Sequence, residues 1–153
     1  TMFKIRPVLL SLLTTVLIAG CASPGLTGGT NRGLVGAWLA SASRPGGQGV
    51  VLITFNSDGT FFRSGDTHPI LSVAHGSWKR TSDRDFDATY IAWRFDENRK
   101  LIGSQKTRIR ITHGPGQDQF TGLAKVSLLD LKGGEERSSQ TRLEGKRIQV
   151  EPF

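Results

Sequence analysis

The sequence predicts an all-β domain, an eight-stranded antiparallel barrel whose strands run up and down in chain order. Three observations support this fold class. Short runs rich in Val, Ile, Thr and aromatic residues recur at even spacing after residue 33. Polar clusters with Gly, Asp, Asn or Pro separate these runs, and no long apolar period of 3.6 residues interrupts them. Two of the runs also alternate between apolar and polar residues, the pattern of a half-buried strand.

The eight strands are expected at 34–42, 50–56, 60–63, 75–81, 86–95, 101–112, 119–129 and 138–150. Most connections are short; residues 56–59, for example, end in a Gly that suits a tight hairpin. The exception is the longer connection Gly65–Ala74, which contains His68 and Pro69. Eight strands joined by hairpins form a meander, and closure into a barrel removes its edges.

Alternation indicates one interior face. In 101–112, Lys106, Arg108 and Arg110 occupy alternate positions, while Ile109 and Ile111 occupy the others. In 119–129 the apolar series falls on the even positions Phe120, Gly122, Ala124, Val126 and Leu128. A period of two with one charged face predicts that each of these strands has one side in the core and one in water.

The first twenty residues predict a secretory signal. After Met2, Lys4 and Arg6 form a short positive region, and residues 7–19 form an apolar run without a charge. This run is shorter than the roughly 20 apolar residues that a membrane-spanning helix needs. We therefore expect residues 2–20 to be a signal peptide that is removed.

The segment Leu17-Ile18-Ala19-Gly20-Cys21 resembles the lipobox of bacterial lipoproteins. The resemblance implies cleavage after Gly20, lipid on the Cys21 thiol, and a membrane-anchored protein of the bacterial cell envelope. Ala22 in place of Asp implies the outer membrane, facing the periplasm. The alternative is an ordinary signal peptide with a chance cysteine. Cys21 is the only cysteine, so no disulfide is expected.

Residues 21–32 are small, polar and rich in Gly, which predicts a flexible tether before a barrel domain at 33–153. Without Lys4 and Arg6, the net charge falls from +7 to +5. This charge suits anionic lipids or glycans and gives no reason to expect nucleic acid. The cationic stripe of the 101–112 strand could lie along such a surface, or could be an ordinary solvated face. We expect a monomer.

The first strand opens with Gly36-Ala37-Trp38, and the last contains Gly145-Lys146-Arg147. These motifs resemble the start and end of lipocalin-like (calycin) barrels, and the chain is also similar to small secreted bacterial proteins of uncharacterised function. The resemblance implies that Trp38 closes one end of the barrel and stacks against Arg147. A guanidinium over an indole contributes about 0.5–2 kcal/mol. The chain lacks the family's Thr-Asp-Tyr motif and its disulfide.

An eight-stranded barrel can be filled by side chains or can hold one small ligand. The leading hypothesis is a hydrophobic or amphipathic ligand in the interior; the alternative is a filled barrel with an envelope-structural or interaction role. The residues expected to line a ligand site are Phe55, Trp78, Tyr90, Gly103, Phe120, Gly122 and Ala124.

Neither a metal site nor a catalytic site is expected. His68, His75 and His113 lie in different segments, with none of the spacings of a metal motif. No Gly-x-Ser-x-Gly elbow, phosphate loop or dinucleotide fingerprint occurs. The run from Asp83 to Asp87 has acids at alternate positions but lacks the Gly and Glu of a calcium loop. We therefore expect no cofactor and no enzymatic activity.

Overall fold

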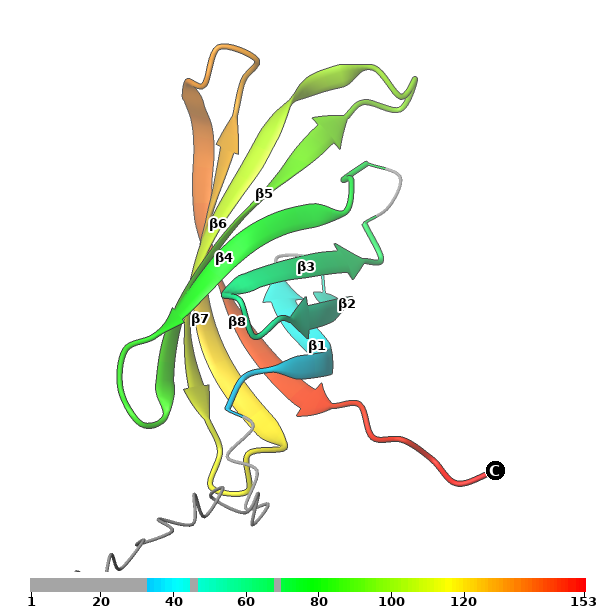
Figure 1. The fold of residues 1–153 in the computed structure, drawn as a ribbon. Coiled ribbons are helices and arrows are strands. Elements are labelled where there is room, and N and C mark those ends of the chain that lie inside the picture. Colours follow the sequence, from blue (N-terminus) through cyan, green and yellow to red (C-terminus); the bar gives the residue numbers. More distant parts are fainter. Residues whose placement is uncertain (1–32, 45–46, 68–69) are drawn as a thin grey trace, which may run out of the picture. The chain divides into compact units, whose positions relative to one another are not determined.

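A computed structural model describes residues 33–44, 47–67 and 70–153. The described chain is all-β, as predicted, and its strands form a closed antiparallel barrel (Figure 1). The strands are β1 (Gly36–Arg44), β2 (Gly47–Phe55), β3 (Thr60–Gly65), β4 (Ala74–Arg80), β5 (Asp85–Phe95), β6 (Leu101–His113), β7 (Gln119–Leu129) and β8 (Glu135–Arg147). No helix capable of crossing a membrane occurs in this described part.

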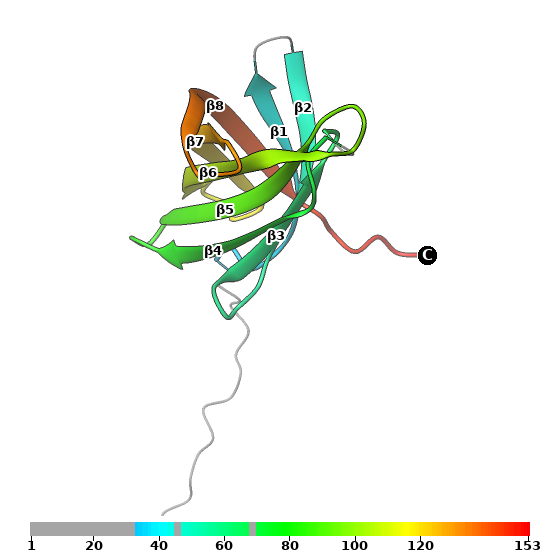
Figure 2. The ribbon, with the colours of Figure 1, turned by 90° about the horizontal axis from the view of Figure 1, so that it is seen from above.

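Each strand pairs with the next one in sequence, and β8 returns to pair with β1 (Figure 2). In this closing ladder Trp38 lies opposite Arg147 and Ser43 lies opposite Arg142. The predicted alternation is confirmed in β6, because Ile109 and Ile111 are buried while Arg108 and Arg110 are exposed. In β7 it holds as far as Lys125, after which Ser127, expected on the outer face, is buried. Closure therefore leaves one interior and one solvated outer surface.

Several strand boundaries differ from the prediction. β2 begins at Gly47 and β8 at Glu135, each three residues earlier than expected. The start of β8 shows no alternation, because residues 135–140 are exposed on both faces. Leu34 precedes β1 instead of belonging to it; its side chain is buried at the end of the barrel. β8 stops at Arg147, and Ile148 donates one further backbone hydrogen bond, to Ala37.

Aromatic side chains fill the half of the interior nearest Leu34. They form a continuous series of ring contacts with centroid separations of 4.9–6.1 Å. The series is Phe120, Trp38, His113, Phe86, Trp78, Phe55, Phe61 and Tyr90. Such pairs add about 0.5–1.5 kcal/mol each beyond area burial. We call this half the sealed end.

The opposite end, which we call the open end, is built from hairpins of unequal length. The β5–β6 and β7–β8 hairpins extend furthest, at the top of Figure 1. Residues 135–141 of β8 pair with β7 alone, because β1 pairs with β8 only from Arg142 onward. A side chain on Gly103 would collide with the carbonyl oxygen of Leu129, so glycine allows β6 and β7 to approach here. This end of the barrel is therefore less enclosed than the other.

Candidate functional site

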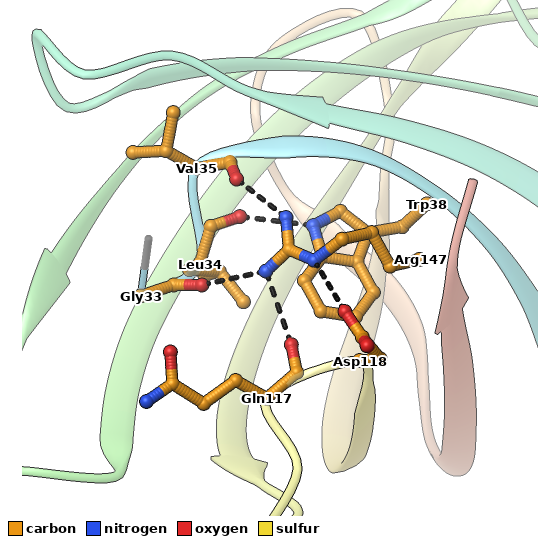
Figure 3. Close-up of polar contacts among 7 residues, drawn as sticks. All are labelled: Gly33, Leu34, Val35, Trp38, Gln117, Asp118 and Arg147. Atoms are coloured by element: carbon orange, nitrogen blue, oxygen red, sulfur yellow. Dashed lines mark hydrogen bonds and ion pairs between the residues drawn. The ribbon is translucent and has the colours of Figure 1, made fainter. Parts of the chain in front are cut away.

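Arg147 seals one end of the barrel by bonding two segments of the chain, residues 33–35 and residues 117–118, to the end of β8 (Figure 3). Its guanidinium donates hydrogen bonds to the carbonyl oxygens of Val35 (2.6 Å), Gly33 (2.8 Å) and Gln117 (3.1 Å). Its Nε pairs with Asp118 at 3.2 Å. Arg147 thus holds the start of β1 and the β6–β7 turn against the end of β8.

The predicted stacking of Arg147 on Trp38 is confirmed. The guanidinium carbon lies 4.2 Å from the indole centroid, and the indole itself is fully buried. Trp38 Nε1 donates a hydrogen bond to the carbonyl of Leu34 at 2.9 Å, so the one polar atom of the ring has a partner (Figure 3). The indole of Trp38 is therefore covered by the guanidinium on its face, and its nitrogen is hydrogen-bonded.

Gly36 makes this arrangement sterically possible. Its φ angle is +125°, and a Cβ at this position would lie 2.7 Å from Nη1 of Arg147. Side chains are rarely found with such a φ, and here one would also displace the guanidinium. The glycine of the Gly-x-Trp motif thus leaves space for Arg147, which is distant in sequence but adjacent in the fold.

A cavity of about 190 Å³ occupies the interior near the open end. Its wall comes from β1–β3, β5–β8 and the β3–β4 connection. The apolar part of the wall consists of Ala42, Val51, Ile53, Leu71, Ile109, Ala124, Val126 and Leu143. The polar part consists of Arg63, Thr67, Tyr90, Gln105, Thr107, Ser139 and Thr141. The cavity therefore combines an apolar surface with a cluster of hydrogen-bonding groups.

Among the described residues of the cavity wall, Arg63 alone carries a formal charge, and none is a carboxylate. The residue is 8 % exposed, and its guanidinium carbon lies 5.9 Å from the Tyr90 ring centroid. Thr67 Oγ1 is buried in the same wall without a hydrogen-bond partner. Tyr90 and Thr107 both accept hydrogen bonds from Gln105 Nε2, at 3.3 and 3.2 Å.

Of the seven residues expected to line a ligand site, Tyr90 and Ala124 lie on the cavity wall. The other five do not line this cavity. Phe55, Trp78 and Phe120 belong to the aromatic series that fills the sealed end. Gly103 lies at the β6–β7 approach, and a Cβ on Gly122 would touch Ile109 and Leu143. The expected set and the cavity wall differ because the sequence reasoning treated the interior as one space, whereas aromatic packing divides it.

Sequence reasoning missed Arg63 and Thr67, although a signal for Arg63 exists. The adjacent Phe61 and Phe62 leave the inward face of β3 ambiguous. Once Phe61 points inward, as its burial requires, the period of two also turns Arg63 inward. Thr67 has no such signal, because it belongs to the irregular connection between β3 and β4.

Other predicted features lie on the outer face or outside the described residues. Arg108 and Arg110 are exposed, and Arg110 Nε lies 3.6 Å from a carboxylate oxygen of Asp87. They border a wide outer depression of about 770 Å³ that is open to solvent. Within the described ranges, no three His, Cys, Asp or Glu side chains form a group able to hold a metal ion. Cys21 and His68 lie outside those ranges.

The geometry defines a class of protein: a closed up-and-down β-barrel, sealed at one end, with a small cavity of mixed polarity near the other. Comparison with known proteins adds no family to this description. No protein-family model matches the chain, and no curated protein or solved structure matches it.

Proposed function

We propose that this protein is a lipid-anchored binding protein of the bacterial envelope, not an enzyme, whose barrel takes a small amphipathic molecule. The cavity near the open end is the observation that carries this proposal. The Gly-x-Trp start and the stacked arginine of the last strand add the resemblance to lipocalin-like barrels, many of which enclose ligands.

The size of the cavity limits the ligand. An apolar cavity of about 150 Å³ is large enough to bind benzene. The cavity of about 190 Å³ therefore suits a molecule slightly larger than benzene, or the end of a longer chain that protrudes through the open end. The mixed wall favours a ligand with an apolar body and a polar group, because buried polar groups otherwise remain without partners.

The anchor is proposed from the sequence. Cys21 would carry the lipid, and two or three acyl chains bury enough CH₂ groups, at about 0.8 kcal/mol each, for stable attachment. Cys21→Ala should release the protein from the membrane fraction or leave it unprocessed with its signal. Metabolic labelling with a fatty acid provides the measurement, and wild-type protein without label would contradict the anchor. The outer membrane, facing the periplasm, is the proposed location.

Native mass spectrometry tests ligand binding. Protein purified from the envelope should carry an extra mass that disappears after unfolding and refolding. The same refolded protein should regain mass when incubated with an envelope extract. Equal masses before and after refolding, with no uptake from the extract, would instead favour a role for the outer surface as an envelope-structural or interaction protein.

A pair of variants on one strand provides the control. Val51 lines the cavity, whereas its neighbour Leu52 lies on the outer face and is 49 % exposed. Val51→Phe should fill the cavity and abolish the extra mass, while Leu52→Phe should retain it. Thermal unfolding of both variants verifies that they are folded. Loss of the ligand in the Leu52 variant alone would place the binding site outside the barrel.

A further inference from the structure

We infer that the cavity is selective for an anionic ligand, a small carboxylate held by Arg63. This inference rests on the proposed function, because it specifies the polar group of the molecule that the barrel binds. It starts from an uncompensated charge. Among the described residues, the Arg63 guanidinium has a ring contact with Tyr90 but no hydrogen bond or ion pair.

A buried guanidinium without a partner is unusual. Charged groups in protein interiors are normally paired, because the loss of hydration must be offset by another charge or by hydrogen bonds. Arg63 is more than nine-tenths buried, its nitrogens are not among the fully enclosed atoms, and the described residues of the cavity wall offer it no carboxylate. A ligand carboxylate would supply the missing charge and accept two parallel hydrogen bonds from the planar guanidinium.

Two hydroxyl groups near Arg63 also favour a ligand that accepts hydrogen bonds. The Thr67 hydroxyl is buried without a partner and can donate to a ligand oxygen. The Tyr90 hydroxyl accepts a hydrogen bond from Gln105, which leaves its own proton free to donate. The cavity thus presents donors from Arg63, Thr67 and Tyr90 beside an apolar wall.

Gly65 contributes space for the guanidinium. It follows Arg63 by two residues on the same face of β3, and a Cβ there would lie 2.9 Å from Nη2 of Arg63. The same Cβ would also lie 2.9 Å from the backbone oxygen of Val50. Glycine at this position therefore leaves room for the guanidinium as well as for the neighbouring strand.

The test compares acids with their neutral amides. The refolded full chain is titrated with butanoate, hexanoate, octanoate and benzoate, and with the primary amide of each, by isothermal titration calorimetry. The carboxylates that fit should bind about 10- to 100-fold more tightly than their amides, the range expected for hydrogen bonds to a charged group. Arg63→Met should remove this preference while retaining amide binding, and Arg63→Lys should retain part of it.

A matched control excludes the overall positive charge as the cause. Arg108→Met removes one exposed arginine from the outer face and should leave carboxylate binding unchanged. Equal binding of acids and amides by the wild-type protein would overturn the anionic preference and leave the binding function intact. Failure to bind any member of either series would overturn both. Equal loss in the Arg63 and Arg108 variants would reduce the preference to a surface-charge effect and overturn the site.

Discussion

At the residue scale, the sealed end concentrates stability in a few side chains. Trp38 is fully buried, bonded through its indole nitrogen to Leu34, and covered by Arg147. Removing a buried indole loses both its transfer free energy and the packing around the space that it leaves. This makes Trp38 the residue at which a substitution should have the largest effect on unfolding.

Trp38→Ala should lower the free energy of unfolding by about 3–5 kcal/mol. Urea titration followed by circular dichroism measures the change. Trp93 offers a control of the same residue type, because it lies on the outer face and is 54 % exposed. Trp93→Ala should cost about 0.5 kcal/mol or less. Equal effects of the two substitutions would contradict the role of Trp38 in sealing the barrel.

Gly36 can be tested against a second glycine with a similar backbone. Gly36 and Gly47 have φ angles of +125° and +134°, but a Cβ on Gly47 would meet no atom within 4 Å. Both alanine variants carry backbone strain, whereas only Gly36→Ala also displaces Arg147. Gly36→Ala should therefore cost more, by about 1–3 kcal/mol, than Gly47→Ala in urea unfolding. Equal losses of unfolding free energy in the two variants would indicate that backbone strain alone accounts for the effect of Gly36→Ala.

His113 should make stability depend on pH. Burial lowers the pKa of its imidazole below 6.5, and the charges of Arg147, Arg80 and Arg84 lower that pKa further. Below pH 6.5 the unfolded chain binds a proton that the folded protein excludes, so the free energy of unfolding falls as the pH drops toward the folded-state pKa. Above pH 6.5 this contribution to stability is fully present.

Urea titrations between pH 7.5 and 5.5 measure this dependence. His113 packs against Trp38 and Phe86, and its Nε2 is buried without a hydrogen-bond partner. His113→Phe therefore keeps an aromatic ring and removes the titration. The variant should show a flatter pH profile than the wild type over this range. An unchanged profile would assign the dependence to other groups.

At the scale of elements, sequence predicts the strands better than their ends. The alternation in β6 and in β7 as far as Lys125 identifies both strands and their inward faces, because one side of each lies in water. The start of β8 escapes this reasoning: Glu135 and Glu136 are solvated on both sides and show no period. The division of the interior is likewise not predictable from the sequence, because ring contacts such as Phe55–Phe61 join residues of different strands. The alternation within one strand does not show which of these side chains meet.

The two halves of β8 should differ in local stability. Residues 135–141 pair only with β7, whereas residues 142–146 pair with both β7 and β1. Amides in the first half should exchange with solvent faster by hydrogen-exchange mass spectrometry, because fewer contacts must break to open them. The facing part of β7 should show the same weakening. Uniform protection along β8 would contradict this one-sided pairing.

At the scale of the whole molecule, the two ends of the barrel differ. Gly33, at which the described chain begins, lies beside Arg147 at the sealed end. The cavity lies toward the other end, between hairpins whose connections differ in length. A ligand that approaches through the open end therefore meets neither the start of the domain nor the sealing arginine. The residues that border the open end are therefore different from those that close the barrel at the sealed end.

Refolding should separate early strand formation from late closure. The hydrogen bond from Arg147 to Val35 joins residues 112 positions apart, and contacts so distant in sequence form slowly. In a variant with Trp38 as its only tryptophan, indole fluorescence should reach its native value later than the far-ultraviolet circular dichroism signal. Stopped-flow measurements detect this difference. Simultaneous changes would show that the closing ladder forms together with the hairpins.

The β1–β8 pairing also has a consequence for the order in which the chain is made. Ribosomes and export channels deliver a polypeptide from its amino end, so β1 is the first strand to appear and β8 the last. The edge of β1 that faces β8, with the buried indole beside it, must wait for nearly the whole domain to be delivered. During that interval the unpaired backbone groups of β1 are open to pairing with another chain, and a chaperone that covers this edge would prevent such pairing.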